Sequence, residues 1–465
     1  MYIQTKNSNL YWYSEKESLL LYNPNVNKGD YKNRKDAFLK SNGLMDDYYP
    51  DFITNYDPNY LKVNLANLRM LIIEVTDLCN LSCEYCGYGK LYNNYDKRIG
   101  KKQSFENVKL MIDYLSNLWK SSLNVSYNNE IGISFYGGEP LIAIDLIKEI
   151  ISYIESLNFT SLTFSYYMTT NSYLLDKYMD YLVDKNFHLL LSLDGDKENN
   201  SYRVTRDNAS SFEKVYANII GLYKKYPAFF ETNVGFNSVL HNRNSVLQVS
   251  SFIKNNFNKI PTVAELNSNG IAEDKRNEFF SMYKNRFQDA ESLGQCENLG
   301  QDMLLMDSSV MSFSFFIDAF TSNTYMGYAD LFVDKKKQRY IPTGTCQPLK
   351  RKIFLTVNNK ILSCERIGQL YSLGKIENGE VRIDFNAICD FYSNMYKSIV
   401  EQCKQCVLWN NCTLCVYFIL DDKGRRICNR FLSKKKAGEY FSEYLSMAEN
   451  QTFLFKKIID RMDRY

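Results

Sequence analysis

The chain has 465 residues, 45% of them hydrophobic, so it is long enough for two or three domains with sizeable cores and does not have the composition of a disordered protein. Its 56 lysines and arginines nearly balance its 53 aspartates and glutamates, which leaves a net charge of +3 and no charge run that would indicate a nucleic acid or an anionic membrane as partner. The N-terminus has no signal-peptide pattern and no stretch approaches the length of a membrane span, so we expect a cytoplasmic protein.

Residues 1–66 are expected to form a small separate unit. Segment 10–24 alternates aromatic and polar residues around Glu15-Lys16-Glu17, which predicts a hairpin, and segment 31–43 predicts a short helix closed by Gly43. Because a lone hairpin is marginal in water, it must pack on a helix or on the next domain.

Strand and helix patterns alternate over residues 67–270. Short apolar runs predict buried parallel strands at 68–76, 130–138, 162–171, 187–195, 232–240 and 260–267. Helical patterns lie between them at 104–119, 141–157, 174–186, 212–226 and 245–257. This order predicts an α/β fold, a partial parallel (β/α)6 barrel, in which functional residues gather at the carboxyl ends of the strands.

The last part of the chain differs in composition. Residues 271–335 are expected to form a mainly helical bridge, and residues 336–465 a cysteine-rich domain that ends in an amphipathic helix. The chain has 12 cysteines and only two histidines, and cytoplasmic thiols stay reduced. Sulfur-only ligation then points to iron-sulfur clusters or zinc.

The first cysteine group is a CxxxCxxC triplet, Cys79, Cys83 and Cys86, directly after the first predicted strand. Three thiolates can hold three corners of a 4Fe-4S cluster and leave one iron open. Zinc with three cysteines and a water molecule, or a redox CxxC pair, are the alternatives.

With Tyr85 just before its third cysteine, the triplet resembles the signature of the radical S-adenosylmethionine enzymes, and the resemblance covers roughly residues 67–270. It implies that the open iron binds S-adenosylmethionine and that the reduced cluster cleaves this cofactor to a 5'-deoxyadenosyl radical. An external electron donor of the flavodoxin or ferredoxin type would reduce the cluster.

Further segments resemble the same family in the same order. Gly137, Gly138 and Glu139 resemble its GGE motif, and Thr170 and Asn171 its TNG segment, with Ser172 where glycine is usual. The resemblance implies that these residues bind the cofactor, that Ser192 and Arg203 meet its carboxylate, and that Asp194 orders the strand end. Arginine suits a carboxylate because its planar fork bonds both oxygens. Taken singly, each could instead be a turn, capping or surface residue.

The C-terminal cysteines resemble the seven-cysteine SPASM domain, which carries auxiliary 4Fe-4S clusters. The resemblance implies that one auxiliary cluster is bound by Cys403, Cys406, Cys412 and Cys428, and the other by Cys346, Cys364 and Cys415. The second set lacks a fourth thiolate, so either its cluster has an open iron or Cys389 or Cys296 completes it. Structural zinc sites are the alternative.

The sequence departs from the SPASM pattern at two places. Asn359 stands where the pattern usually has glycine, and asparagine can replace it because it tolerates a left-handed backbone. The spacing between Cys412 and Cys415 is one residue shorter than usual, which puts ligation by Cys415 in question. Glu365 follows Cys364 where some sulfatase-maturing relatives have a catalytic aspartate, so it is a candidate base, with a salt bridge as the plainer interpretation.

Together these features predict a radical SAM/SPASM enzyme acting on a peptide or protein. Residues 1–66 resemble in layout the modules that bind leader peptides by strand addition, or else they only cover the barrel. We therefore expect a maturase that installs a thioether or carbon-carbon crosslink in a ribosomally made precursor peptide. The alternatives are an anaerobic sulfatase-maturating enzyme, which forms formylglycine, and a non-catalytic electron-transfer or scaffold protein.

Overall fold

The computed structural model describes residues 1–14, 18–21, 30–43, 50–125, 130–160, 162–285, 341–409, 414–422 and 425–450, with single residues 289, 313, 316, 317, 412 and 452. They belong to two compact units, here called the terminal unit (1–56, 308–346 and 390–465) and the barrel unit (57–307 and 347–389). Both units are discontinuous, whereas the four expected domain ranges are consecutive. Most of the expected bridge, Cys296 and the end of the expected C-terminal helix lie outside the described residues.

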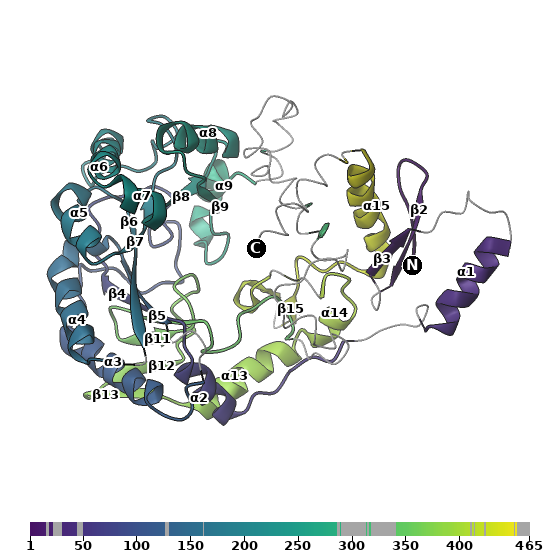
Figure 1. Cartoon of the computed structure of the whole chain (residues 1–465), viewed down its shortest axis with the longest axis horizontal. Coiled ribbons are helices and arrows are strands. Elements are labelled where there is room, and N and C mark those ends of the chain that lie inside the picture. Colours follow the sequence, from purple (N-terminus) through teal and green to yellow (C-terminus); the bar gives the residue numbers. More distant parts are fainter. Residues whose placement is uncertain are drawn as a thin grey trace. The chain divides into compact units, whose positions relative to one another are not determined.

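A ten-stranded sheet forms the centre of the barrel unit (Figure 1). Six neighbouring strands pair in parallel and in chain order: β4 (Met70–Thr76), β5 (Glu130–Gly137), β6 (Thr163–Thr170), β7 (His188–Ser192), β8 (Val234–Leu240) and β9 (Thr262–Glu265). They coincide with the six expected strands. The parallel arrangement confirms the predicted partial barrel.

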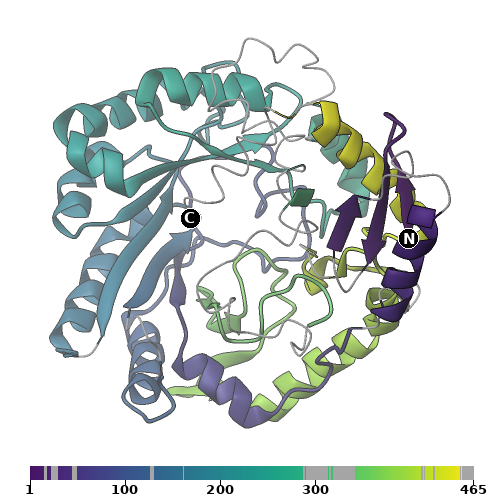
Figure 2. The same ribbon diagram turned by 45° about the vertical axis from the view of Figure 1, so that its right-hand side comes forward.

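Helices cover the outer face of these strands (Figures 1 and 2). The five expected helices are present as α3 (Phe105–Trp119), α4 (Ile144–Ser156), α5 (Leu175–Asp184), α6 (Phe212–Lys225) and α8 (Val246–Phe257), and the sequence did not predict α7 (Pro227–Asn233) or the 3-10 turn η2 (Pro140–Ala143). On α4 the fully buried residues Ile147, Ile150, Ile151 and Ile154 recur every three or four positions, which makes one apolar face. On β8, Phe236 stacks on Phe257 of α8 with ring centroids 4.9 Å apart.

The sheet continues beyond β4 with strands that the sequence analysis had assigned to the C-terminal domain. These are β10 (Lys352–Leu355), β11 (Lys360–Leu362), β12 (Gly374–Glu377) and β13 (Glu380–Ile383). Strand β10 is parallel to β4, and the other three follow antiparallel. Asn359, in the turn between β10 and β11, has φ of 63°, which is the left-handed conformation expected for it. The unit also contains α2 (Pro58–Ala66), η3 (Glu273–Lys275) and α9 (Arg276–Met282).

The terminal unit contains a three-stranded antiparallel sheet of β1 (Tyr2–Gln4), β2 (Leu10–Ser14) and β3 (Ser18–Leu21). The predicted hairpin is β2 and β3, and it packs on a helix as expected, because the ring of Tyr13 lies 4.6 Å from the ring of Phe441 on α15 (Lys434–Asn450). The other elements are α1 (Asp30–Ser41), the end of α13 (Phe385–Lys397), α14 (Val400–Lys404), η8 (Val416–Phe418), β14 (Leu420–Asp422) and β15 (Arg425–Ile427). Within the described ranges, no helix combines the length and apolarity that crossing a membrane requires.

Candidate active site

The cysteine triplet lies in the loop that follows β4. Burial is the main reason that the pKa of Cys79 rises to about 11 and that of Cys83 to about 12, and the neighbouring thiol of Cys86 adds to both shifts. The three side chains are therefore close enough to interact electrostatically. All three thiols lie in one short loop, and a cluster bound by them would need three thiolates from such a segment.

The turn after β5 runs directly against this loop. The Gly138 N–H donates to the carbonyl oxygen of Thr76 at 2.9 Å, and the Glu139 N–H donates to that of Leu78 at 2.8 Å. A Cβ atom on Gly137 would lie 2.2 Å from the Thr76 oxygen, and one on Gly138 would lie 2.1 Å from the Leu78 oxygen. Only glycine permits this approach, so the double glycine fixes the cysteine loop against β5.

Glu139 connects the end of β5 to the end of β6. Its buried carboxylate accepts hydrogen bonds from the Thr170 hydroxyl at 2.8 Å, the Asn171 N–H at 2.8 Å and the Leu141 N–H at 3.1 Å. Burial raises the pKa of Glu139 to about 7, although these donors favour its ionised form. The glutamate thus holds Thr170 and Asn171 in position.

Asn171 completes the connection back to the cysteine loop. Its side-chain amide donates to Oδ1 of Asn80 at 2.8 Å and lies 3.6 Å from Sγ of Cys79. Ser172, which replaces the glycine usual in the family, has φ of 64°, so it occupies a left-handed conformation that favours glycine. Three of the predicted site segments are therefore joined at one end of the barrel strands.

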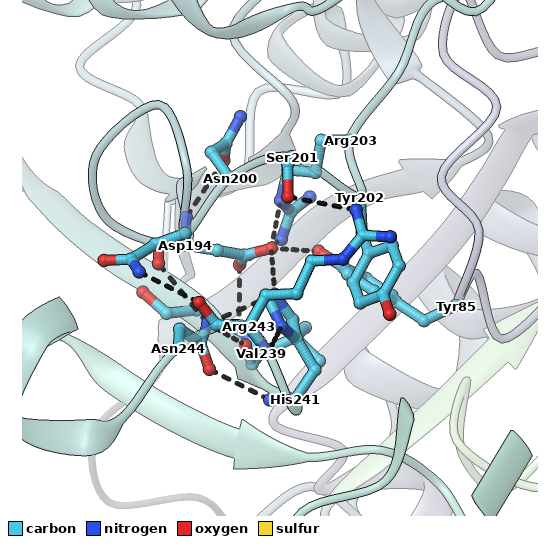
Figure 3. A network of polar contacts seen from close by, with 12 residues as sticks. Tyr85, Asp194, Asn200, Ser201, Tyr202, Arg203, Val239, His241, Arg243 and Asn244 are labelled. Carbon is cyan, nitrogen blue, oxygen red and sulfur yellow. Dashed lines mark hydrogen bonds and ion pairs between the residues drawn. The ribbon is translucent and has the colours of Figure 1, made fainter. Parts of the chain in front are cut away.

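Asp194, two residues beyond the end of β7, is the centre of a buried network (Figure 3). Its carboxylate binds Nε and Nη2 of Arg203, each at 2.9 Å, and accepts hydrogen bonds from the Tyr85 hydroxyl and from the Val239 N–H at 2.9 Å. Tyr85 lies between Cys83 and Cys86 in sequence, so the network ties the cysteine loop to β7 and β8. Ser192 is buried at the end of β7, close by in sequence.

His241 extends this network at the end of β8. Its ring is fully buried, stacks on the ring of Tyr85 with centroids 5.6 Å apart and lies 3.9 Å from the Asp194 carboxylate. The side-chain amide of Asn244 nearby donates a hydrogen bond to the carbonyl oxygen of Val239 on β8. Burial lowers the pKa of His241 to about 4, with the cations of Arg203 and Arg243 contributing, against the opposing effect of Asp194. The sequence analysis missed His241, although a histidine directly after a predicted barrel strand is a usable signal.

Cys364 and Glu365 follow β11 in the barrel unit. Glu365 is largely buried and forms an ion pair with Lys352, with oxygen-to-nitrogen distances of 2.7 and 2.8 Å. Burial pushes the pKa of Glu365 upward, but the Lys352 ammonium outweighs this effect and leaves the pKa below its ordinary value. The carboxylate is thus in a salt bridge, as the plainer interpretation expects. A role as base stays a prediction.

In the terminal unit, one cavity of about 80 Å³ brings together Cys403, Cys406, Cys412 and Cys428. These are the four cysteines that the sequence assigns to one auxiliary cluster. Burial, aided by the other three thiols, raises the pKa of Cys403 to about 12. The rest of the lining is mainly apolar and aromatic and includes Phe52, Ile399, Ile419, Trp409 and Phe431.

The remaining predicted ligands divide between the units. Cys346 and Cys415 belong to the terminal unit, where the Val416 N–H donates to the Thr345 hydroxyl at 2.5 Å, and Cys364 belongs to the barrel unit. Cys389 is buried in α13. Among the described residues, no three Cys, His, Asp or Glu side chains converge on a position for a single metal ion.

Comparison with known proteins identifies the barrel. Residues 73–242 match the Radical SAM superfamily. The barrel strands and the loops between them are therefore similar to members of that superfamily. The match begins in β4 and ends just after β8, so it contains the cysteine triplet, the Gly-Gly-Glu turn and the Asp194 network.

Individual curated proteins match about the same length of the chain. A cysteine-type anaerobic sulfatase-maturating enzyme of Clostridium novyi is 32% identical over 158 residues, 33% of this chain and 40% of that enzyme. The radical SAM cyclopropyl synthase TigE of Paramaledivibacter caminithermalis is 26% identical over 179 residues, 37% of this chain and 35% of that protein. The matched part is thus less than half the length of either relative.

Solved structures share the radical SAM fold over more of the chain. Native anSMEcpe with bound AdoMet and Cp18Cys peptide is 18% identical, with a TM-score of 0.56 over 86% of this chain and 99% of that one. The polyhistidine-tagged form with bound AdoMet is likewise 18% identical, with a TM-score of 0.55 over 86% of this chain and 96% of that one. At this identity the likeness shows the fold alone.

Proposed function

We propose that the protein is a radical SAM/SPASM enzyme that abstracts hydrogen from a ribosomally made precursor peptide and installs a thioether or carbon-carbon crosslink. The observation that carries the proposal is the cysteine triplet held at the carboxyl ends of the barrel strands, in a chain with a second, four-cysteine cavity. Cytoplasmic location, where thiols stay reduced, is part of the proposal.

Cys79, Cys83 and Cys86 would hold a 4Fe-4S cluster with one open iron for S-adenosylmethionine. With an electron from a flavodoxin or ferredoxin, this pair of cofactors supplies a 5'-deoxyadenosyl radical when bound. The donor set fits, because thiolates are the usual ligands of such clusters and the three thiols share one loop. What the chain itself contributes is position and a water-poor environment.

The residues around the triplet divide into cofactor contacts and supports. Gly137, Gly138, Thr170 and Asn171 would line the cofactor, while Glu139 holds the last two of these through its carboxylate. Asp194 takes two of the nitrogens of Arg203, so the bond proposed between Arg203 and the cofactor carboxylate would use Nη1, and Ser192 is the second proposed contact of that carboxylate.

Cys403, Cys406, Cys412 and Cys428 would bind one auxiliary 4Fe-4S cluster. Their common cavity supports this assignment, because four thiols, one of them on α14, line the same small space. Cys346, Cys364 and Cys415 would bind the other, with its fourth position open or filled by Cys389 or Cys296. Glu365 is the chain's candidate for taking a proton as the substrate radical is oxidised.

The N-terminal sheet supports a peptide substrate with a leader segment. Strand β3 is an outer strand of the three-stranded sheet, because β2 lies between it and β1. An edge strand offers unpaired N–H and C=O groups to an extended peptide, which is how strand addition gives affinity. We therefore propose that residues 1–66 contribute to leader binding.

The test is coexpression of the protein with the small open reading frame beside its gene, followed by mass spectrometry of the peptide. Loss of two hydrogen atoms from the core region supports a crosslink, since one hydrogen leaves to the radical and a second leaves as a proton and an electron. An unmodified peptide, with 5'-deoxyadenosine formed normally, contradicts the proposed reaction.

A second candidate is oxidation of a sulfatase cysteine or serine to formylglycine. The Clostridium novyi relative is named for this activity, and Glu365 follows Cys364 where relatives of that kind carry a catalytic aspartate. A sulfatase-derived peptide that gains the aldehyde on incubation would favour this candidate. Iron-sulfur clusters without any 5'-deoxyadenosine would instead favour an electron-transfer or scaffold protein.

A further inference from the structure

A second feature of the barrel unit is the inner face of its parallel strands. Along β8 the side chains alternate between fully buried and half-buried positions, and the buried set, which includes Phe236, packs against the helices. The half-buried set therefore faces the inside of the barrel. Strands β6 and β7 show the same alternation near Tyr167 and His188. The interior is thus partly open, unlike the filled core of a closed barrel.

A cavity of about 460 Å³ occupies this inner face. Its lining includes Ser134, Tyr167, Thr169, His188 and Gly235, together with residues 232 and 233, which precede β8 at the amino end of the strands. His188, which lines the cavity, is the first residue of β7, and Ser192, a proposed cofactor contact, is the last. At about 3.3 Å per residue, the two lie about 13 Å apart along the strand. Its size lies within the roughly 300–1,000 Å³ of ordinary ligand pockets.

The chemistry of the lining restricts what can bind there. Not one of the lining residues is an aspartate, glutamate, lysine or arginine. An ionised group would give up part of its water against this lining without gaining a counter-ion from it, which is unfavourable. By contrast, the Ser134 and Thr169 hydroxyls can both donate and accept, which suits peptide N–H and C=O groups. The rings of Tyr167 and His188 are stacked at 4.8 Å and 19° and offer a flat wall to an apolar or aromatic side chain.

We propose that this cavity binds an uncharged segment of the peptide substrate and excludes segments with acidic or basic side chains. The inference rests on the proposed function for the identity of the occupant. A peptide seated here lies in the same barrel as the cysteine triplet, and a few extended residues reach from the cavity to the carboxyl ends of β5 and β7. The cavity would therefore select which part of the peptide is presented for hydrogen abstraction.

Gly235 offers a way to close the cavity without disturbing the cysteines. A Cβ atom there would lie 3.5 Å from Cδ1 of Leu190, which is an ordinary contact, so Gly235→Ala should fold and leave the cavity open. The ring of Gly235→Phe would instead fill part of it. Neither variant touches a proposed ligand, so iron content and 5'-deoxyadenosine formed without peptide should equal those of the wild type and report correct folding.

The experiment uses the cluster-loaded protein with S-adenosylmethionine and a photoreactive tripeptide, N-acetyl-Ala-(p-benzoylphenylalanine)-Ala-amide. Irradiation should attach the probe to peptides that contain Met70 or Leu190, which line the cavity and are half-buried. We expect equal labelling of the wild type and Gly235→Ala, and a loss of at least about tenfold in Gly235→Phe, equivalent to about 1.4 kcal/mol in binding. Equal labelling of all three, or labels spread over the surface, would overturn the inference.

A charge comparison in the wild type keeps the test independent of how the variants fold. The same probe with aspartate, or with lysine, in place of both alanines should label the cavity at least about tenfold less. Labelling by the charged probes at the level of the neutral one contradicts the proposal. Because labelling needs no turnover, an unmodified precursor peptide would count against the proposed reaction while leaving the cavity inference intact.

Discussion

The two cysteine sites are held in different ways. In the barrel unit, polar bonds tie the triplet loop to neighbouring strand ends: Tyr85 to Asp194, Asn80 to Asn171, and the Leu78 carbonyl to the Gly-Gly-Glu turn. In the terminal unit, the four-cysteine cavity is walled mainly by apolar side chains, with Gln402 bonding the backbone of residues 426 and 428. The difference suggests that the protein alone orders the first site, whereas a bound cluster contributes to ordering the second.

The largest expected effect is the loss of 5'-deoxyadenosine formation, which should depend on the cysteine triplet and not on the four-cysteine cavity. Cys83→Ala should abolish 5'-deoxyadenosine formation while most iron in the terminal unit remains, because the triplet alone would bind the cleaved cofactor. The matched variant Cys406→Ala should lose iron yet still form 5'-deoxyadenosine without peptide. Chromatography of the nucleoside products and iron analysis measure both. Formation of 5'-deoxyadenosine by Cys83→Ala would show that the triplet assignment is wrong.

The next effect tests the polar network of the barrel site. Asp194→Asn leaves the buried Arg203 guanidinium without its counter-ion, which should lower the free energy of unfolding by about 3–5 kcal/mol. The control is Asp176→Asn, which removes an exposed pair with Lys214 and should cost about 0–1 kcal/mol. Urea unfolding followed by tyrosine fluorescence measures the two. Equal losses would mean that the network does not hold the loop.

The barrel site should also respond to acid through His241. Its folded pKa of about 4 lies below the ordinary 6.5, so its stabilising contribution is complete above pH 6.5 and is lost as pH falls toward 4. The shift corresponds to at most about 3 kcal/mol. Asp194 raises the pKa of His241 and two arginines lower it. The variant His241→Gln removes the imidazole while keeping these charges, so it shows how much of the pH dependence comes from the imidazole. If the pH dependence of thermal unfolding is the same in His241→Gln, the imidazole is not its source.

The smallest expected effect concerns iron removal. Chelation under reducing conditions should raise amide hydrogen exchange around residues 400–432 by about tenfold or more, equivalent to about 1.4 kcal/mol of local stability, because metal binding contributes folding free energy. Residues 70–92 should change less, since their polar bonds remain. A larger rise in hydrogen exchange at residues 70–92 than at residues 400–432 would contradict the idea that the bound cluster orders mainly the second site.

The barrel was predictable because its strands are local patterns. Six apolar runs separated by five helical patterns leave few other topologies, and the cysteine triplet marks the functional end of the barrel. The same reasoning could not place β10 beside β4. Lys352–Leu355 is a short apolar run whose partner, Met70–Ile73, lies far away in sequence, and no local signal specifies such a pairing.

The sequence predicted which residues belong to the candidate site, but not which hydrogen bonds they make with one another. The resemblance to the family's motifs selected Glu139, Thr170 and Asp194, but not that Glu139 holds Thr170 or that Asp194 takes two nitrogens of Arg203. These contacts depend on how separate strand ends meet in space. The Tyr85 hydroxyl and His241 were missed for the same reason, because their partners lie on other strands.

The pairing of β4 with β10 has a consequence for how the protein is made. Ile72 pairs with Phe354, and buried Glu74 accepts a hydrogen bond from the Val357 N–H, so one edge of the first barrel strand stays unpaired until most of the chain has left the ribosome. An apolar strand edge exposed for that long invites pairing with other nascent chains. Production of this protein should therefore depend on slow synthesis or on chaperones, and truncation before residue 352 should yield aggregates.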